Sequence, residues 1–223
     1  MDHNYIKQFI GNFRVVNTLT DQSLVPQSWH SILESSNQRE RVQKVCDIWS
    51  QSYNQKLSTL IKTFDRYLLD VHIIEAEEVL AMLYIFDQGG EEQYYIGKNP
   101  LQKKIPAAVL PLWNKLPDDF TRFYQQVHNG WYELNSEAVG PLSVEDFTIL
   151  SSNEWGILDE IKPSFSLDKV VSVFSNGAGG YLCWNLNGES PEALLWWHDE
   201  APDTNIDFWD VLDEWATMGI DEE

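Results

Sequence analysis

The chain has 223 residues, of which 43% are hydrophobic and ten are tryptophan, and this composition indicates a globular protein with a large core rather than a disordered one. Its formal net charge of −20 is uneven, because residues 1–115 hold 12 Lys/Arg and 13 Asp/Glu (12 − 13 = −1) while residues 116–223 hold 3 and 22 (3 − 22 = −19). Nucleic acids and anionic membranes are therefore disfavoured as partners, since binding them requires clustered Lys and Arg.

The first hundred residues contain two apolar patterns of helical period. A short helix is predicted over residues 5–16. From Arg39 the apolar positions step by threes and fours, which predicts one helix of roughly thirty residues with a single packing face. Its apolar stripe consists of Val42, Val45, Cys46, Trp49, Tyr53, Leu57, Leu60, Ile61, Phe64, Leu68 and Val71.

A hairpin follows this helical region. Residues 79–86 read as a buried strand, residues 87–90 as a turn and residues 93–96 as a second strand. The proline-containing stretch 99–111 is then predicted to join the two parts of the chain.

The parts on either side of this joint are interpreted as a helical and hairpin extension, residues 1–101, and an α+β domain, residues 102–223. The alternative is one continuous domain in which the hairpin joins the main sheet.

The acidic half, residues 116–223, is predicted to contain helices and strands joined by short turns. A helix is predicted over residues 118–127, ending at an Asn-Gly pair. Three strands are predicted at 169–174, 181–186 and 193–198, with short turn-forming connections that indicate an antiparallel meander. A closing helix is predicted over residues 206–218. The fold class is therefore α+β, a mostly antiparallel mixed sheet packed by helices.

Part of this half resembles a known family. The run LPDDFTRFY at residues 116–124, followed by Asn129-Gly130-Trp131, resembles the opening helix of SUKH (Smi/Knr-like) domains. Residues 171–186 are similar to the family's strand, glycine turn and strand, and residues 208–215 to its closing helix. The turn reads Gly179-Gly180-Tyr181, where many relatives carry an acidic residue after the glycine, so no binding role is carried over to it.

The resemblance implies a non-enzymatic cytoplasmic immunity protein that neutralises a bacterial toxin. Such toxins are often basic nucleases, which agrees with the acidic half, because complementary charge raises association rates. The alternative is a scaffold or regulatory module of the same fold. Acidity that serves only solubility is also open. No catalytic residue and no cofactor is implied.

Patterns for enzymatic or metal chemistry are weak. Cys46 and Cys183 lie far apart and fit two buried thiols. His128 and His198 are candidate acid–base residues only if one pocket brings them together. Residues 203–214 match several positions of a calcium loop, but Phe208 stands where glycine is required, so a helix start capped by Asp203 or Thr204 is preferred. No metal site is predicted.

Tryptophan is concentrated in the acidic half, which holds seven of the ten. Trp196 and Trp197 are adjacent on a predicted strand and must point to opposite faces, so either both faces are covered or one indole helps to form a contact surface. Interfaces are enriched in tryptophan and tyrosine. An exposed aromatic patch is predicted just after the Asn-Gly stop and steering acids after the third strand. The predicted partner-binding residues are Trp131, Tyr132, Glu133, Trp197, Asp199, Glu200 and Asp203.

Overall fold

The computed structural model describes residues 1–221, and it has the predicted α+β architecture of helices packed on antiparallel sheets. The helices are α1 (His3–Ile10), α2 (Gln27–Leu33), α3 (Gln38–Tyr53), α4 (Ser58–Tyr67), α5 (Leu110–Trp113), α6 (Asp118–Gln126) and α7 (Phe208–Met218). The strands are β1 (Phe13–Val15), β2 (Leu68–Ala76), β3 (Val79–Gln88), β4 (Glu91–Lys98), β5 (Trp131–Glu133), β6 (Gly140–Pro141), β7 (Thr148–Ile149), β8 (Val170–Ser175), β9 (Gly180–Asn185), β10 (Glu192–Trp197) and β11 (Asp203–Thr204).

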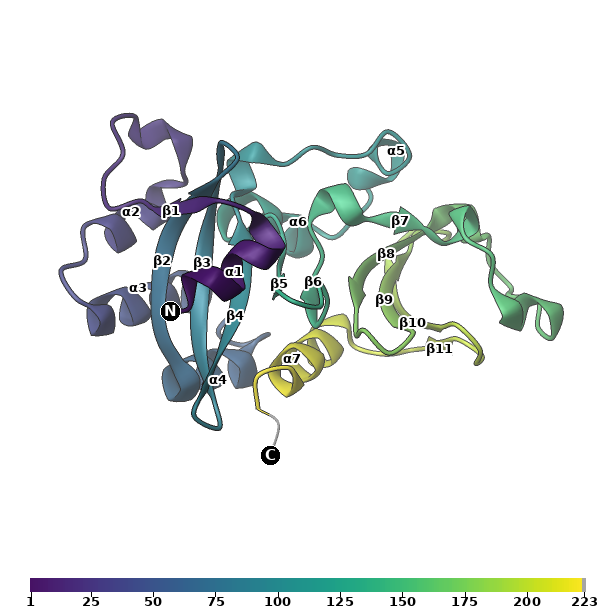
Figure 1. Ribbon diagram of the computed structural model, residues 1–223. Helices are drawn as coiled ribbons and strands as arrows, with labels where there is room; N and C mark the ends of the chain where they lie inside the picture. The colour runs from purple at the N-terminus through teal and green to yellow at the C-terminus, as the bar shows by residue number, and fades with distance from the viewer. Residues whose placement is uncertain (222–223) are drawn as a thin grey trace.

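The strands form two sheets that stand side by side (Figure 1). The first has the order β1-β2-β3-β4-β5, and the second has the order β11-β10-β9-β8-β6, with β7 also paired to β8. The chain crosses between them at the β5–β6 turn, where the Glu133 amide donates to the Ala138 carbonyl at 3.0 Å. Just beyond, the Val139 amide donates to the Ser175 carbonyl of β8 at 3.0 Å. The crossing therefore fixes the two sheets to each other.

The first sheet is covered on both faces. Helices α3 and α4 pack on one face, where the Trp49 and Phe64 rings lie 5.1 Å apart and Phe64 lies 5.5 Å from Phe86 of β3. Helix α1 covers the other face and buries Ile6 against Leu83. A strand with two covered faces needs an apolar residue at every position. This explains the uninterrupted apolar run of β3.

The second sheet is also covered on both faces, by different kinds of element. On one face α7 packs with Phe208 stacked on Trp184 of β9, the ring centroids being 4.2 Å apart. On the other face the short turns of residues 150–169 bring Trp155 to within 5.6 Å of Trp196 on β10. Successive residues of β10 thus enter two separate clusters, as the period of a strand requires.

Most of the predicted elements are confirmed. The hairpin is β3 and β4, the helix after the joint is α6, the meander is β8, β9 and β10, and the closing helix is α7. The Asn-Gly pair does not itself end α6, which stops at Gln126, but Gly130 has the expected left-handed conformation with φ of +84°. A Cβ there would also lie 2.5 Å from the Ser143 amide, so only glycine fits.

The prediction of one thirty-residue helix is wrong. Helix α3 ends at Tyr53, α4 begins at Ser58, and the last apolar positions belong to strand β2. The break has a tertiary cause, because the Asp213 carboxylate of α7 accepts from the Thr59 amide at 3.0 Å and from the Leu60 amide at 2.8 Å. A carboxylate in that place caps a new helix. Its position 153 residues away is invisible to local periodicity.

The prediction of a helix over residues 5–16 is only half right. Helix α1 ends at Ile10, and Gly11 follows with φ of +70°. Residues Phe13–Val15 then form β1, which pairs with the end of β2 so that Phe13 lies opposite Ala76. The apolar residues of β1 therefore pack beside α1 rather than continue it.

The predicted division near residue 101 does not separate two cores. Strand β5 comes from the second part of the chain but completes the first sheet, and Trp131 on it lies 5.5 Å from Trp49 of α3. The largest buried cluster contains residues from both parts, from Val16 to Ile220. The hairpin of the first part thus joins a sheet that the second part helps to build.

A candidate protein-binding face

The seven tryptophans of the acidic half differ in exposure. Four of them, Trp131, Trp155, Trp184 and Trp196, are buried. The other three are half-buried, and all lie on β10 or α7: Trp197, Trp209 and Trp215. The indoles that reach the surface therefore belong to elements of the segment after Lys169, which contains no Lys or Arg.

Trp197 and Trp215 meet where the end of β10 lies against α7. Their rings pack edge to face with centroids 5.9 Å apart and planes at 65°, and Trp215 also lies 5.6 Å from Phe174 of β8. The Trp197 Nε1 donates to the Asp203 carboxylate at 3.2 Å. Because β11 pairs with β10, Asp203 is held opposite Leu195, within reach of that indole. The two indoles thus form a fixed aromatic surface beside a carboxylate.

A glycine makes room for this arrangement. Gly180 at the start of β9 is paired with Trp197, and a Cβ at Gly180 would lie 2.5 Å from the Trp197 ring. Real Cβ atoms do not approach a ring that closely, so a larger residue would displace the indole. The turn that departs from the SUKH pattern at Gly179-Gly180 therefore has a packing reason.

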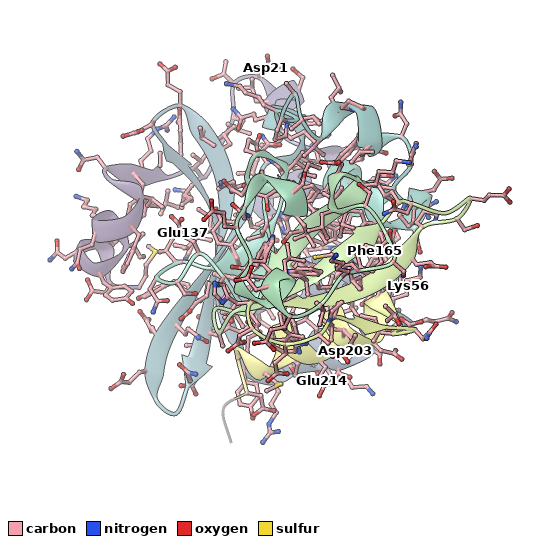
Figure 2. All side chains as sticks on the ribbon, turned by 90° about the vertical axis from the view of Figure 1, so that its right-hand side faces the viewer. Asp21, Lys56, Glu137, Phe165, Asp203 and Glu214 are labelled. Carbon is pink, nitrogen blue, oxygen red and sulfur yellow. The ribbon has the colours of Figure 1, made fainter. Side chains whose placement is uncertain are left out.

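Four exposed carboxylates belong to the segments that carry or follow the two indoles. Asp199 and Glu200 are exposed in the loop after β10, Asp203 is exposed on β11, and Glu214 is exposed on α7 next to Trp215. Asp203 and Glu214 are both labelled in Figure 2. Among residues 1–221, none of these four pairs with a Lys or Arg. We call this set, Trp197, Trp215, Asp199, Glu200, Asp203 and Glu214, the acidic tryptophan face.

The predicted exposed patch at residues 131–133 is wrong. Trp131 is 0% exposed and stacks on Tyr95 with centroids 4.4 Å apart. Tyr132 is buried beneath Lys98, whose Nζ lies 5.4 Å from the ring centroid. Glu133 is half-buried and accepts from the Ser136 hydroxyl at 2.7 Å. These residues are covered because they form β5, an edge strand that pairs with β4 inside the covered first sheet.

The structure does not bring the two candidate acid–base histidines together. His128 is 0% exposed, and its Nε2 is hydrogen-bonded to the Tyr84 hydroxyl at 2.5 Å, while Tyr84 accepts from Trp49 Nε1 at 3.0 Å. Burial lowers the pKa of His128 to about 3, so it is neutral at physiological pH. His198 is exposed beside Trp155 on the second sheet. The two imidazoles therefore share no site.

The remaining reactive groups are enclosed or scattered. Both cysteines are free and buried, and burial raises the pKa of Cys46 to about 11 and raises that of Cys183 further. Within the described chain no three His, Cys, Asp or Glu side chains are grouped as metal ligands. The calcium-like segment consists of β11 followed by the start of α7. Its helix is capped by Asp207 rather than by Asp203 or Thr204, since the Asp207 carboxylate accepts from the amides of Trp209 and Asp210.

Sequence reasoning missed the contribution of α7. Trp209 and Trp215 flank its buried positions Phe208, Leu212 and Ala216, and this spacing was available from the sequence. The residues that these two indoles contact could not be read from the sequence. Trp209 Nε1 donates to Asp119 of α6 at 3.2 Å, and Trp215 packs against Trp197 of β10. Half-exposure of an indole depends on such partners and not on helical period alone.

No protein-family model, curated protein or solved structure matches this chain. None of the helices in residues 1–221 is long and apolar enough to cross a membrane.

Proposed function

We propose that this protein binds and neutralises a cationic protein toxin through the acidic tryptophan face, as the resemblance to SUKH immunity proteins implies. The observation that supports the proposal most is the contact between two half-buried indoles, Trp197 and Trp215, with the exposed Asp203 carboxylate bonded to Trp197. An indole that is already packed on one side loses little freedom on binding, and it buries a large area.

The charge of the surrounding segment fits this role. Residues 192–221 contain nine Asp/Glu and no Lys or Arg. A surface of one sign raises the local concentration of a partner of the other sign and suppresses encounters with acidic proteins. The aromatic pair then provides the contact that slows dissociation. The acidic residues raise the association rate constant, and the indoles lower the dissociation rate constant of the complex.

A growth assay tests the proposal. Genes adjacent to this one are expressed under an inducible promoter to find one that stops growth, and we expect co-expression of this protein to restore growth. Trp197→Ala should abolish the rescue. Trp113→Ala is the matched control, because Trp113 is another half-buried indole, on α5 and packed against Tyr124. Binding of the purified toxin without rescue would point instead to a scaffold, and no binding would refute the proposal.

A further inference from the structure

A pocket opens beside the acidic tryptophan face, at the N-terminal end of α7. Its volume is about 320 Å³, and Trp184, Glu192, Ala193, Asp207, Phe208 and Trp209 are among the residues that line it. Pockets for drug-sized ligands begin near ~300 Å³. This one therefore has room for a single long side chain of a partner.

The walls of the pocket are aromatic. Trp184 and Phe208 stack with centroids 4.2 Å apart and planes at 17°, and Trp209 stands edge-on to Phe208 at 5.4 Å and 82°. Trp209 is the half-buried member of the three. Indole has the strongest π-face of the natural side chains toward a cation, and Trp209 is the wall residue that is partly open to solvent.

Trp209 already binds a cation within the protein. The Lys56 Nζ lies 4.6 Å from the Trp209 ring centroid and pairs with the Asp119 carboxylate, which also accepts from Trp209 Nε1 at 3.2 Å. Burial works to raise the pKa of Asp119, but the hydrogen bond and charge of Lys56 outweigh it and keep that pKa below its usual value. The indole is thus part of an existing cation-binding cluster at the edge of the pocket.

Two carboxylates line the pocket. The Glu192 carboxylate is exposed and makes no hydrogen bond or ion pair within residues 1–221. Asp207 uses one oxygen, Oδ1, to cap α7, accepting from the Trp209 amide at 2.8 Å and from the Asp210 amide at 3.1 Å. The N-terminus of α7 carries only about half a positive charge. Two full negative charges therefore outweigh it, and the pocket favours a cation.

We propose that this pocket receives an arginine side chain of the cationic partner, an inference that rests on the function proposed above. A guanidinium is planar and weakly hydrated, so it can stack on aromatic rings while its N–H groups bond to carboxylates. A lysine ammonium is a compact, strongly hydrated charge and makes less use of flat walls. The pocket is therefore selective for arginine, whereas the open acidic tryptophan face responds to any positive charge.

The test uses two fluorescent peptides that differ only in the cation, fluorescein-(Gly-Arg)₃-amide and fluorescein-(Gly-Lys)₃-amide. We expect the wild-type protein to bind the arginine peptide about threefold more tightly or better. Glu192→Gln should weaken arginine-peptide binding about tenfold. Ala193→Phe, which fills the pocket, should weaken it by at least as much. Glu189→Gln is the matched control, because Glu189 is exposed in the adjacent turn and is not among the lining residues.

Three outcomes overturn the inference: no binding of the arginine peptide, equal binding of both peptides, or binding that both pocket variants leave unchanged. Glu192 is exposed, so its variant keeps the test valid if Ala193→Phe fails to fold. If the toxin binds and is neutralised but the pocket variants have no effect, the pocket inference fails and the proposed function stands. If the toxin does not bind but the arginine peptide still binds in the pocket, the function fails and the pocket stands.

Discussion

Replacing Asp213 by alanine should destabilise the whole protein, because this carboxylate joins α7 to the start of α4. Asp213 is 9% exposed, and it accepts from the amides of Thr59 and Leu60 at 3.0 and 2.8 Å. Loss of a helix cap costs about 0.5–2 kcal/mol, and each buried amide left without a partner costs about 1–3 kcal/mol. Since these costs overlap, we expect a loss of about 3 kcal/mol in the free energy of unfolding for Asp213→Ala. Asp213→Asn keeps one acceptor oxygen, and about 1 kcal/mol is expected.

Urea denaturation followed by both tryptophan fluorescence and far-UV circular dichroism measures this effect. The control is Glu214→Ala, an exposed neighbour on the same helix, for which a change within about 0.5 kcal/mol is expected. The two probes should report one transition, because α4 and α7 belong to one shared core. If Asp213→Ala lost no more stability than Glu214→Ala, the carboxylate would not be the cause of the break between α3 and α4.

Three other predictions follow from the same structure. The pKa of His128 is about 3 in the folded protein and about 6.5 in the unfolded chain, so between these pH values the unfolded chain binds more protons. The free energy of unfolding should therefore fall by about 2 kcal/mol from pH 7 to pH 5. Urea midpoints measured for His128→Gln should lack this pH-dependent loss. Gly180→Ala should displace the Trp197 indole, cost about 1–3 kcal/mol and shift the tryptophan emission maximum, whereas Gly188→Ala, in the next turn, should leave the emission unchanged. Neither cysteine should react with a thiol reagent at neutral pH until the protein unfolds, because both thiols are buried and their pKa values are raised; fast labelling of the native protein would contradict this.

The fold could be predicted where local pattern and tertiary surroundings agree. The β3–β4 hairpin and the β8–β9–β10 meander follow from apolar runs bounded by glycine and asparagine turns, and both are confirmed. The apolar residues from Leu57 to Val71 led to a wrong prediction, because their spacing fits a helix throughout although the chain changes to a strand at Leu68. The helix break depends on a cap from α7, which is distant in sequence, and the change to a strand depends on pairing with β3, the next strand along the chain.

The candidate site could be predicted only in part. Strand period requires Trp196 and Trp197 to face opposite ways, and one is buried while the other is half-buried. The acids after the third strand, Asp199, Glu200 and Asp203, are exposed, and their steering role stays a prediction. The prediction that Trp131 is exposed was wrong, because nothing near Trp131 in the sequence shows that β5 pairs with β4 in a covered sheet. Which tryptophan reaches the surface is set by such long-range packing.

The most direct test of the central claim compares two triple variants with equal loss of charge. One changes the face, Asp199→Asn with Glu200→Gln and Asp203→Asn. The other changes exposed acids in the turns that cover the opposite face of the second sheet, Glu154→Gln with Asp159→Asn and Glu160→Gln.

The association rate constant with the proposed toxin, measured at about 0.15 M salt, where the Debye length is about 8 Å, should fall about tenfold for the first variant. It should fall less than about twofold for the second, since net charge alone acts weakly at a distance in salt. Equal effects of the two variants would show that total charge, and not the acidic tryptophan face, directs the encounter.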